Sequence, residues 1–381
     1  MCERRAWRSA LCVALGLLGL SASAQTGADF RQSGPYKTLL QRSETLDGEP
    51  YTLDLNRLRL EIKGQPSEAL AFDLQVDNEV LLGSYLRTAE FQARKDVPPP
   101  QYASARSNTV ERRHLYGTLD LYRAHLQFTH GDADVRIGRQ RIAWGTGRFW
   151  SPSDLLNPFS PLALEREERL GVDALLAQYK LGPVSRVAAV VAPSRRAGET
   201  SSAVQWHDNA RGLDYSLTAG RFRGDRVLGL DLAGQVGPTG VRAELTRTVP
   251  RNAPAFVRAL AGIDHAFANT LTLTAEVYRD GSGARDPAAY DVPALLAGAR
   301  QTLARRYAGL HARYELTPLL KVAAEIVVNL DDSSRFLAPR LSYSWQTDLD
   351  VAIEWRRFHG APASEFGRLP NATHLSLQAF F

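Results

Sequence analysis

The sequence contains almost no cysteine and has no long apolar run away from its N-terminus. Both cysteines, Cys2 and Cys12, lie close to that end, so the rest of the chain offers no disulfide framework and no thiolate metal or redox site. One apolar stretch, 9–20, stands out, and this excludes a protein that crosses a membrane with several helices. The charge is nearly balanced, with 46 Lys and Arg against 41 Asp and Glu, which argues against nucleic-acid binding.

The first 24 residues have the composition of a secretory signal peptide. Three arginines lie near the start, residues 9–20 are apolar, and residues 22–24 are Ala-Ser-Ala, a small-residue cleavage site. The alternative is an uncleaved anchor, for which the apolar stretch is short. We predict a signal peptide over 1–24 and a mature chain over 25–381.

The mature chain alternates between apolar and polar residues with a period of two. In the segment 318–330, Leu320, Val322 and Ile326 share one parity, whereas Lys321 and Glu325 lie on the other. The pattern recurs near residues 58, 70, 122, 241, 271 and 337. Alternating segments of roughly ten residues, separated by turns, are typical of a transmembrane β-barrel. A soluble β-sandwich or β-helix also alternates, but two further features favour the barrel.

The first feature is the C-terminus, where the chain ends at Phe381 within an alternating segment, 372–381. A final strand that ends in an aromatic residue resembles the assembly signal of Gram-negative outer-membrane barrels. The resemblance implies that Phe381 contacts the barrel-assembly machinery and that the protein lies in the outer membrane of a Gram-negative bacterium. Tyr343, Trp345 and Trp355 also lie near predicted strand ends, where aromatic girdles form.

The second feature is the spacing of the connections. The predicted strands cover 36–45, 54–63, 69–82, 114–129, 132–144, 172–181, 184–193, 199–208, 212–222, 226–236, 238–248, 256–266, 270–279, 304–315, 318–329, 335–346, 348–358 and 372–381. Every second connection is then short, and the long ones, 83–113, 145–171, 280–303 and 359–371, share the opposite end. We therefore predict an all-β fold, a closed antiparallel up-and-down transmembrane barrel of 18 strands, with 16 as the alternative.

The segment 132–171 is the candidate functional region. Its strand changes parity near Gly138, which predicts a β-bulge. The loop that follows is rich in proline and aromatic residues, and we expect it to lie against the inner wall or to form a lid over the mouth. The residues expected to pack this loop in place are Trp144, Phe149, Trp150, Asn157 and Pro158.

Charged residues in the same segment are segregated along the sequence. Basic residues precede or open the loop and acidic residues follow, namely Arg136, Arg139, Arg141 and Arg148, then Asp154, Glu165, Glu167 and Glu168. Across a narrow lumen, opposed charges would set a transverse field and a charge preference. The alternative is a set of surface charges and local ion pairs. Arginine also exceeds acid on the predicted inward faces, which include Arg57, Arg59, Arg242 and Arg340, and this predicts a mild anion preference.

The stretch GRQRIAWGTGRFWSPSDLLNP resembles the G-R-Q-x-x-x-W-G segment, followed by an Asn-Pro loop, of porin-like outer-membrane proteins, which include the alginate-export-type barrels. The matching positions are Gly138, Arg139, Gln140, Trp144, Gly145, Asn157 and Pro158. Outside this stretch the likeness is one of architecture. The resemblance implies a monomeric or trimeric channel for small solutes or an exported polymer, without fixing the substrate or the oligomer.

These observations predict an outer-membrane channel for diffusion or export of small or acidic solutes, in contact with membrane lipid. In the alternative, loops 145–171 and 280–303 plug the barrel, which then acts as a surface scaffold or a gated exporter for a polysaccharide or a partner protein. An outer-membrane enzyme is a weaker alternative, because the sequence has no HExxH, GxSxG or phosphate-loop motif. We predict no catalytic residue, cofactor or metal.

Overall fold

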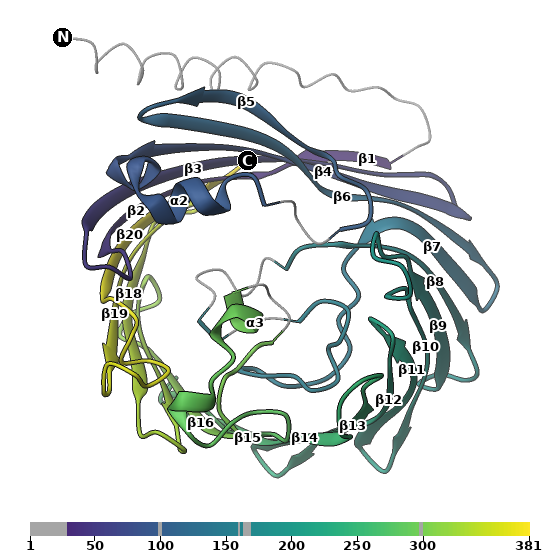
Figure 1. Cartoon of the computed structure of the whole chain (residues 1–381). Coiled ribbons are helices and arrows are strands. Elements are labelled where there is room, and N and C mark those ends of the chain that lie inside the picture. The colour runs from purple at the N-terminus through teal and green to yellow at the C-terminus, as the bar shows by residue number, and fades with distance from the viewer. Residues whose placement is uncertain (1–28, 98–100, 159–160, 163–168, 297–299) are drawn as a thin grey trace.

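The chain folds into one antiparallel β-sheet that closes on itself (Figure 1). The computed structural model describes residues 29–97, 101–158, 161–162, 169–296 and 300–381, so the predicted signal peptide lies outside the described residues. Strand β2 (Pro35–Glu44) pairs with β3 (Pro50–Ser67) on one side and with β20 (Ala372–Phe380) on the other. This last pairing joins the two ends of the sheet and leaves no open edge, as a sheet in lipid requires.

Of the 20 strands in the sheet, 18 form the closed ring. The two others are β1 (Asp29–Ser33), which continues the line of β2 along β3, and β5 (Arg106–Arg112), which pairs with β6. The remaining strands of the ring are β4 (Leu70–Gly83), β6 (Leu115–His130), β7 (Ala133–Gln140), β8 (Val172–Lys180), β9 (Arg186–Ala192), β10 (Ser201–Ala210), β11 (Leu213–Phe222), β12 (Asp225–Val236), β13 (Thr239–Val249), β14 (Phe256–Ala266), β15 (Thr272–Asp280), β16 (Arg306–Glu315), β17 (Leu320–Asn329), β18 (Arg335–Gln346) and β19 (Leu349–His359). The predicted 18-strand barrel is confirmed.

The outer face of the ring is apolar. Leu228 is 62% exposed and Val277 is 56% exposed, and comparable side chains line the outside of nearly every strand. The opposite parity of the same strands carries polar and charged residues toward the inside, among them Glu244 and Glu276. An apolar outside around a polar inside is the arrangement of a barrel that spans a membrane. Among the described residues, no helix combines the length and hydropathy needed to cross a membrane.

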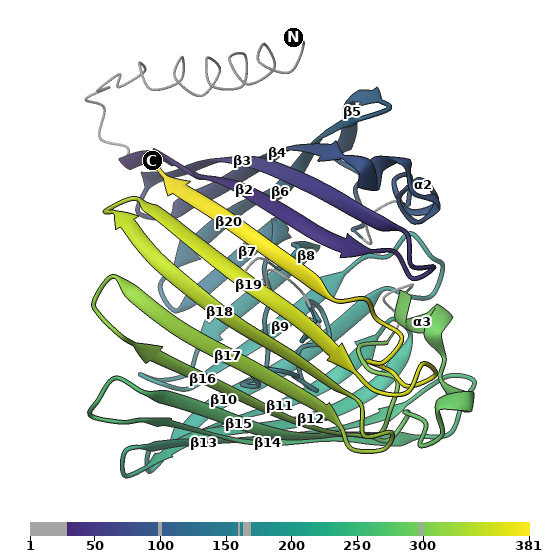
Figure 2. The same ribbon diagram turned by 90° about the vertical axis from the view of Figure 1, so that its left-hand side faces the viewer.

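Every second connection is short, as predicted. The turns that follow β3, β6, β8, β10, β12, β14, β16 and β18 have five residues or fewer, and they share one end of the barrel, here called the short-turn end. The long connections share the other, long-loop end. Figure 2 shows the C-terminus at the short-turn end and α3 (Val292–Leu296) at the long-loop end. The other helices, η1 (Ser84–Arg87), α2 (Ala89–Arg94) and η2 (Pro287–Ala289), also belong to long connections.

The predicted strand 132–144 is too long, and its bulge is misplaced. Strand β7 ends at Gln140, and its register with β6 and β8 is continuous through Gly138. A register shift instead lies on β6, beside Tyr122. Gly138 has φ +119°, and a Cβ there would collide with the carbonyl oxygen of Ala124, so the position requires glycine for close approach of two backbones. The parity change in the sequence arises because the chain leaves the sheet after Gln140.

Candidate functional site

The connection from β7 to β8 turns into the barrel and lies inside the ring of strands (Figure 1). We call its described residues, 141–158, 161–162 and 169–171, the infolded loop. Asn157 closes the base of this loop, because its Oδ1 accepts a hydrogen bond from the Ile142 amide at 2.8 Å and its Nδ2 donates to the carbonyl of Leu170. Asn157 therefore brings the two ends of the loop together, whereas Pro158, the next residue, is exposed.

The first part of the infolded loop packs against an apolar inner wall. Ile142, Trp144 and Leu156 are buried against side chains of β8 to β12, namely Ala174, Leu176, Ala188, Val190, Ala192, Ala203, Phe222 and Val227. Small residues at four of these wall positions leave room for the Trp144 ring. An apolar inner wall would be unusual in a water-filled lumen, and here it is covered by the loop.

Two wall carboxylates then hold the backbone of the loop. Glu244 on β13 accepts hydrogen bonds from the amides of Gly147 at 2.7 Å and Ser153 at 2.9 Å, and from the Ser151 hydroxyl at 3.0 Å. Glu276 on β15 accepts from two further loop amides, those of Arg148 at 2.7 Å and Phe149 at 2.8 Å. Both carboxylates are buried near the middle of their strands. Hydrogen bonds from amides to an ionised carboxylate are stronger than neutral ones, so this contact fixes the loop firmly.

Beyond these carboxylates the loop inserts two aromatic rings into an apolar cluster. Trp150 is fully buried and stacks on Tyr278 of β15, with ring centroids 5.3 Å apart and planes at 9°. Phe149 lies over Gly309 of β16, where a Cβ would come within 2.9 Å of the ring. The cluster continues to Val327 on β17 and Phe336, Ala338 on β18. The loop therefore follows the inner wall from β8 to β16 and reaches the long-loop ends of β17 and β18.

The last described part of the loop contacts the other half of the wall. The Arg356 guanidinium on β19 donates to the Leu162 carbonyl at 2.8 Å. Arg169 forms an ion pair with the buried Asp154, and its carbonyl accepts a hydrogen bond from the Tyr122 hydroxyl on β6 at 3.0 Å. The structure thus brings Asp154 together with Arg169, which the sequence analysis did not single out.

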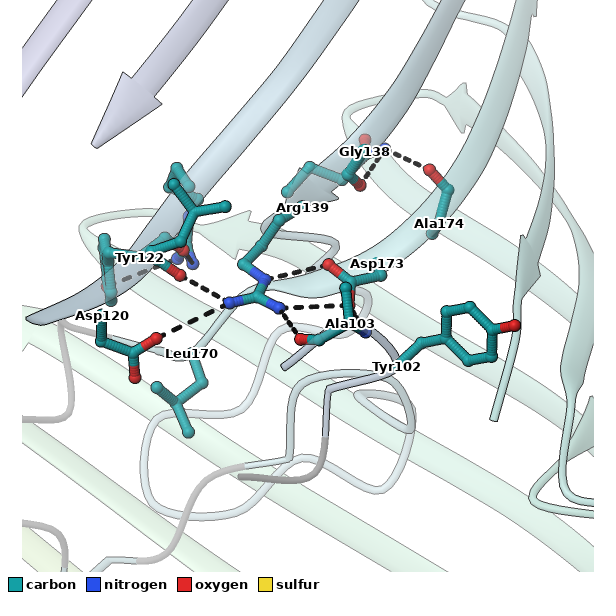
Figure 3. Close-up of polar contacts among 12 residues, drawn as sticks. Tyr102, Ala103, Asp120, Tyr122, Gly138, Arg139, Leu170, Asp173 and Ala174 are labelled. Carbon is teal, nitrogen blue, oxygen red and sulfur yellow. Dashed lines mark hydrogen bonds and ion pairs between the residues drawn. The ribbon is translucent and has the colours of Figure 1, made fainter. Parts of the chain in front are cut away.

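The predicted constriction residues fall in three different settings. Arg141 and Arg148 are exposed on the infolded loop, and Arg136 lies on the inner face of β7 beside Asp134. Arg139, in contrast, is 2% exposed and lies within the wall (Figure 3). Glu165, Glu167 and Glu168 lie outside the described residues.

Arg139 joins three segments of the wall. Its Nε donates to Asp173 of β8 at 2.9 Å, its Nη1 donates to the Leu121 carbonyl at 2.6 Å, and its Nη2 contacts the Ala103 carbonyl. Arg139 lies where β6 changes its pairing partner. Residues 115–120 of β6 pair with β5, and residues 124–130 pair with β7. The rigid fork of donors on a guanidinium suits such a junction.

The rest of the wall, which the infolded loop contacts at Leu162 and Arg169, carries a series of arginines. Arg59 on β3 forms a bidentate pair with Asp77 at 2.6 and 2.7 Å, and its guanidinium lies 3.4 Å from the centre of the Tyr122 ring. Arg57, on the same strand, is buried like Arg59. The side chain of Arg340 on β18, in contrast, is 42% exposed and lies 3.3 Å from Glu354. The remaining predicted lumen residue, Arg242, is buried on β13 and binds Glu276 at 2.9 Å and also Asp264.

A buried carboxylate at the long-loop end ties three connections together. Glu365, between β19 and β20, accepts hydrogen bonds from the Tyr307 hydroxyl at 2.5 Å, the Asn329 amide at 2.8 Å and the Leu303 backbone at 3.2 Å. Burial raises the pKa of Glu365 to about 7, and the donors oppose that shift. We call this cluster the mouth clamp, and no motif in the sequence marks its residues. Among the described residues, no group of three His, Cys, Asp or Glu has the arrangement of a metal site.

No protein-family model and no curated protein matches the sequence. Solved structures do match. OccK5 (OpdH) of Pseudomonas aeruginosa superimposes with a TM-score of 0.60 at 11% identity, over 93% of this chain and 98% of that chain. OpdK of the same organism, solved with vanillate, gives 0.58 at 10% identity, and OccK2 (OpdF), solved with glucuronate, gives 0.56 at 11%, each with the same coverage. The chain therefore has the fold of the Occ outer-membrane porins, an 18-strand barrel.

Proposed function

We propose that this protein is a channel in the outer membrane of a Gram-negative bacterium through which small acidic solutes pass. The observation that carries the proposal is the unequal exposure of charges inside the barrel. Arg141, Arg148 and Arg340 are at least partly exposed there, whereas Glu244 and Glu276 are buried under the infolded loop. Exposed cations beside the permeation path favour the passage of anions.

The ligands in two of the similar structures support the same class of solute. Vanillate and glucuronate, found with OpdK and OccK2, are both small carboxylates. Planar guanidinium groups bind carboxylates through two parallel hydrogen bonds, and the channel interior offers several of them. The membrane location is supported by the apolar outer face and by the fold.

The test is single-channel conductance of the refolded protein in a planar bilayer under a salt gradient. We expect discrete steps and a reversal potential of the sign that indicates anion preference. The double variant Arg141→Gln/Arg148→Gln should move the reversal potential toward zero, because both guanidiniums are exposed to the lumen. The matched control is Arg195→Gln/Arg196→Gln, which removes two exposed arginines from the connection between β9 and β10. Cation preference in the parent protein would contradict the proposal.

A gated barrel is the second candidate, and the mouth clamp favours it. Glu365 holds the connections after β15, β17 and β19 together at the long-loop end, where α3 also lies (Figure 2). In this case the protein would be a gated exporter or a surface scaffold for a polysaccharide or a partner protein. A correctly inserted protein without conductance would favour this candidate, and the variant Glu365→Ala, which breaks the clamp, should then open the pore.

A further inference from the structure

The outer face of the barrel carries a row of arginines at the long-loop end. We call them the outer arginine belt, and its members are Arg221 on β11, Arg226 on β12, Arg247 on β13, Arg279 on β15, Arg306 on β16 and Arg335 on β18. All are exposed, and each lies within three residues of the end of its strand. They share strand parity with exposed apolar residues such as Leu228 and Val277, so they point away from the lumen.

The belt places like charges side by side. Arg221 is directly opposite Arg226, and Arg279 is directly opposite Arg306, on neighbouring strands. Like charges at opposed positions of a sheet destabilise it. Arg306 has a carboxylate partner, Asp331 at 2.8 Å, but the ion pairs of the described residues include none for the five others. No acidic residue shares the outer parity of β11 to β18. Anions that neutralise the other five arginines must therefore come from outside the described part of the chain.

The depth of the belt matches the edge of an apolar membrane layer. On β18, Arg335 lies at the long-loop end and Trp345, 64% exposed, lies ten residues further on at the short-turn end. A strand of that length covers about 33 Å and, tilted at about 40°, about 25 Å of depth, which is the height of the apolar band on such barrels. Aromatic residues, among them Tyr314 and Phe381, lie at the short-turn end. The two rims of the outer face are therefore chemically different.

We infer that the outer arginine belt binds phosphate groups of anionic lipid headgroups in the membrane leaflet on the long-loop side. The inference rests on the proposed outer-membrane location. A row of cations at the long-loop ends of strands between β11 and β18 suits a layer of lipid better than one discrete partner. Guanidinium groups form bidentate hydrogen bonds with phosphate, and a phosphate between Arg221 and Arg226 would relieve their repulsion.

The test compares two lipids and two double variants. The purified protein, in micelles of a non-ionic detergent, is titrated with bisphosphorylated lipid A and with the same lipid after enzymatic removal of its phosphates, and bound lipid is counted by native mass spectrometry. The belt variant is Arg221→Gln/Arg226→Gln. The control is Arg186→Gln/Arg211→Gln, which removes two exposed arginines at the short-turn end. We expect the belt variant to bind the bisphosphorylated lipid about 30-fold more weakly and the control to match the parent.

Two results would overturn the inference. One is equal affinity of the parent for the phosphorylated and dephosphorylated lipids, and the other is equal weakening by the belt and control variants. A second belt variant, Arg279→Gln/Arg335→Gln, repeats the test on other strands and keeps it decisive if the first variant fails to fold. The titration does not use conductance, so a protein that binds lipid phosphate but conducts no ions contradicts the proposed channel and supports the belt.

Discussion

The two halves of the inner wall use their charges differently. On the half covered by the infolded loop, Glu244 and Glu276 hold backbone amides that lie far from them in sequence. On the other half, Arg59 and Arg340 are held by the carboxylates of neighbouring strands, Asp77 and Glu354. A carboxylate bound by backbone amides fixes the course of the chain, whereas the partly exposed guanidinium of Arg340 keeps donors that a solute anion can reach. The same kind of inward charge is thus structural on one half and suited to permeation on the other.

The largest effect should come from removing a carboxylate under the loop. The variant Glu244→Ala leaves several buried amides and the Ser151 hydroxyl without their acceptor. We expect the unfolding free energy of the refolded barrel to fall by about 4 kcal/mol. Single-channel conductance should rise, because a detached loop no longer narrows the lumen. Urea unfolding and bilayer recordings measure the two effects.

The matched control for that variant is Glu61→Gln on β3. Glu61 also faces inward, but its ion-pair partner among the described residues is the exposed Lys63 at 2.9 Å. It should leave both stability and conductance close to the parent values. If Glu244→Ala behaves like this control, the inward carboxylates of the two halves do not differ in their structural role.

The next effect is a pH dependence of the mouth clamp. Because burial raises the pKa of Glu365 to about 7, the folded clamp holds the proton more tightly than the unfolded chain does. The protonated Glu365 therefore stabilises the folded state fully below pH 4.5, the ordinary pKa of a glutamate. This contribution to the unfolding free energy, about 3 kcal/mol, is lost as the pH rises through about 7. Hydrogen exchange of the Leu303 and Phe366 amides should quicken over this range more than the chemical exchange rate alone predicts.

The variant Glu365→Gln is the control for this pH dependence. It keeps the shape of the side chain and removes the titrating group, so its amides should follow the chemical exchange rate across the same pH range. An identical pH profile in the parent and in Glu365→Gln would assign the effect to another group. The mouth clamp resembles the half of the wall beneath the infolded loop, because in both places a buried carboxylate holds chain segments together.

A smaller effect should separate a wall arginine from a lumen arginine. Arg139→Gln breaks the fork that joins Asp173 to the Leu121 carbonyl, and we expect it to lower stability by about 2 kcal/mol without changing ion selectivity. Arg141→Gln should reduce anion selectivity and leave stability close to the parent value, because that side chain is exposed beside the lumen. Both effects are read from urea unfolding and from reversal potentials. A selectivity shift in the Arg139 variant would support the predicted role of this residue in a pore constriction.

The sequence was sufficient for the barrel but not for the site. All 18 ring strands follow from alternation, because water on one face and lipid on the other act on every strand alike. The end of β7 was predicted too late because Ile142 and Trp144 are two positions apart and apolar, as in a strand. In the structure both belong to the loop and are buried against the inner wall. Their partners, such as Ala174 and Ala188, come from other strands. Glu244 likewise looks no different from Glu325 or Glu354 in sequence, since only the folded loop shows which inward acids it contacts.

The smallest effect should come from Arg340, in the middle of β18 and outside the cluster that the loop packs against. Its side chain is 42% exposed and shares Glu354 with Arg356, which binds Glu354 more closely, at 2.7 Å against 3.3 Å. Arg340→Gln should therefore cost well under about 1 kcal/mol of stability, as partly exposed ion pairs do. It should still reduce anion preference slightly, measured as reversal potential, and the reduction should shrink at high salt because exposed charges are screened. A large loss of stability would mean that this half of the wall is as rigid as the half beneath the loop.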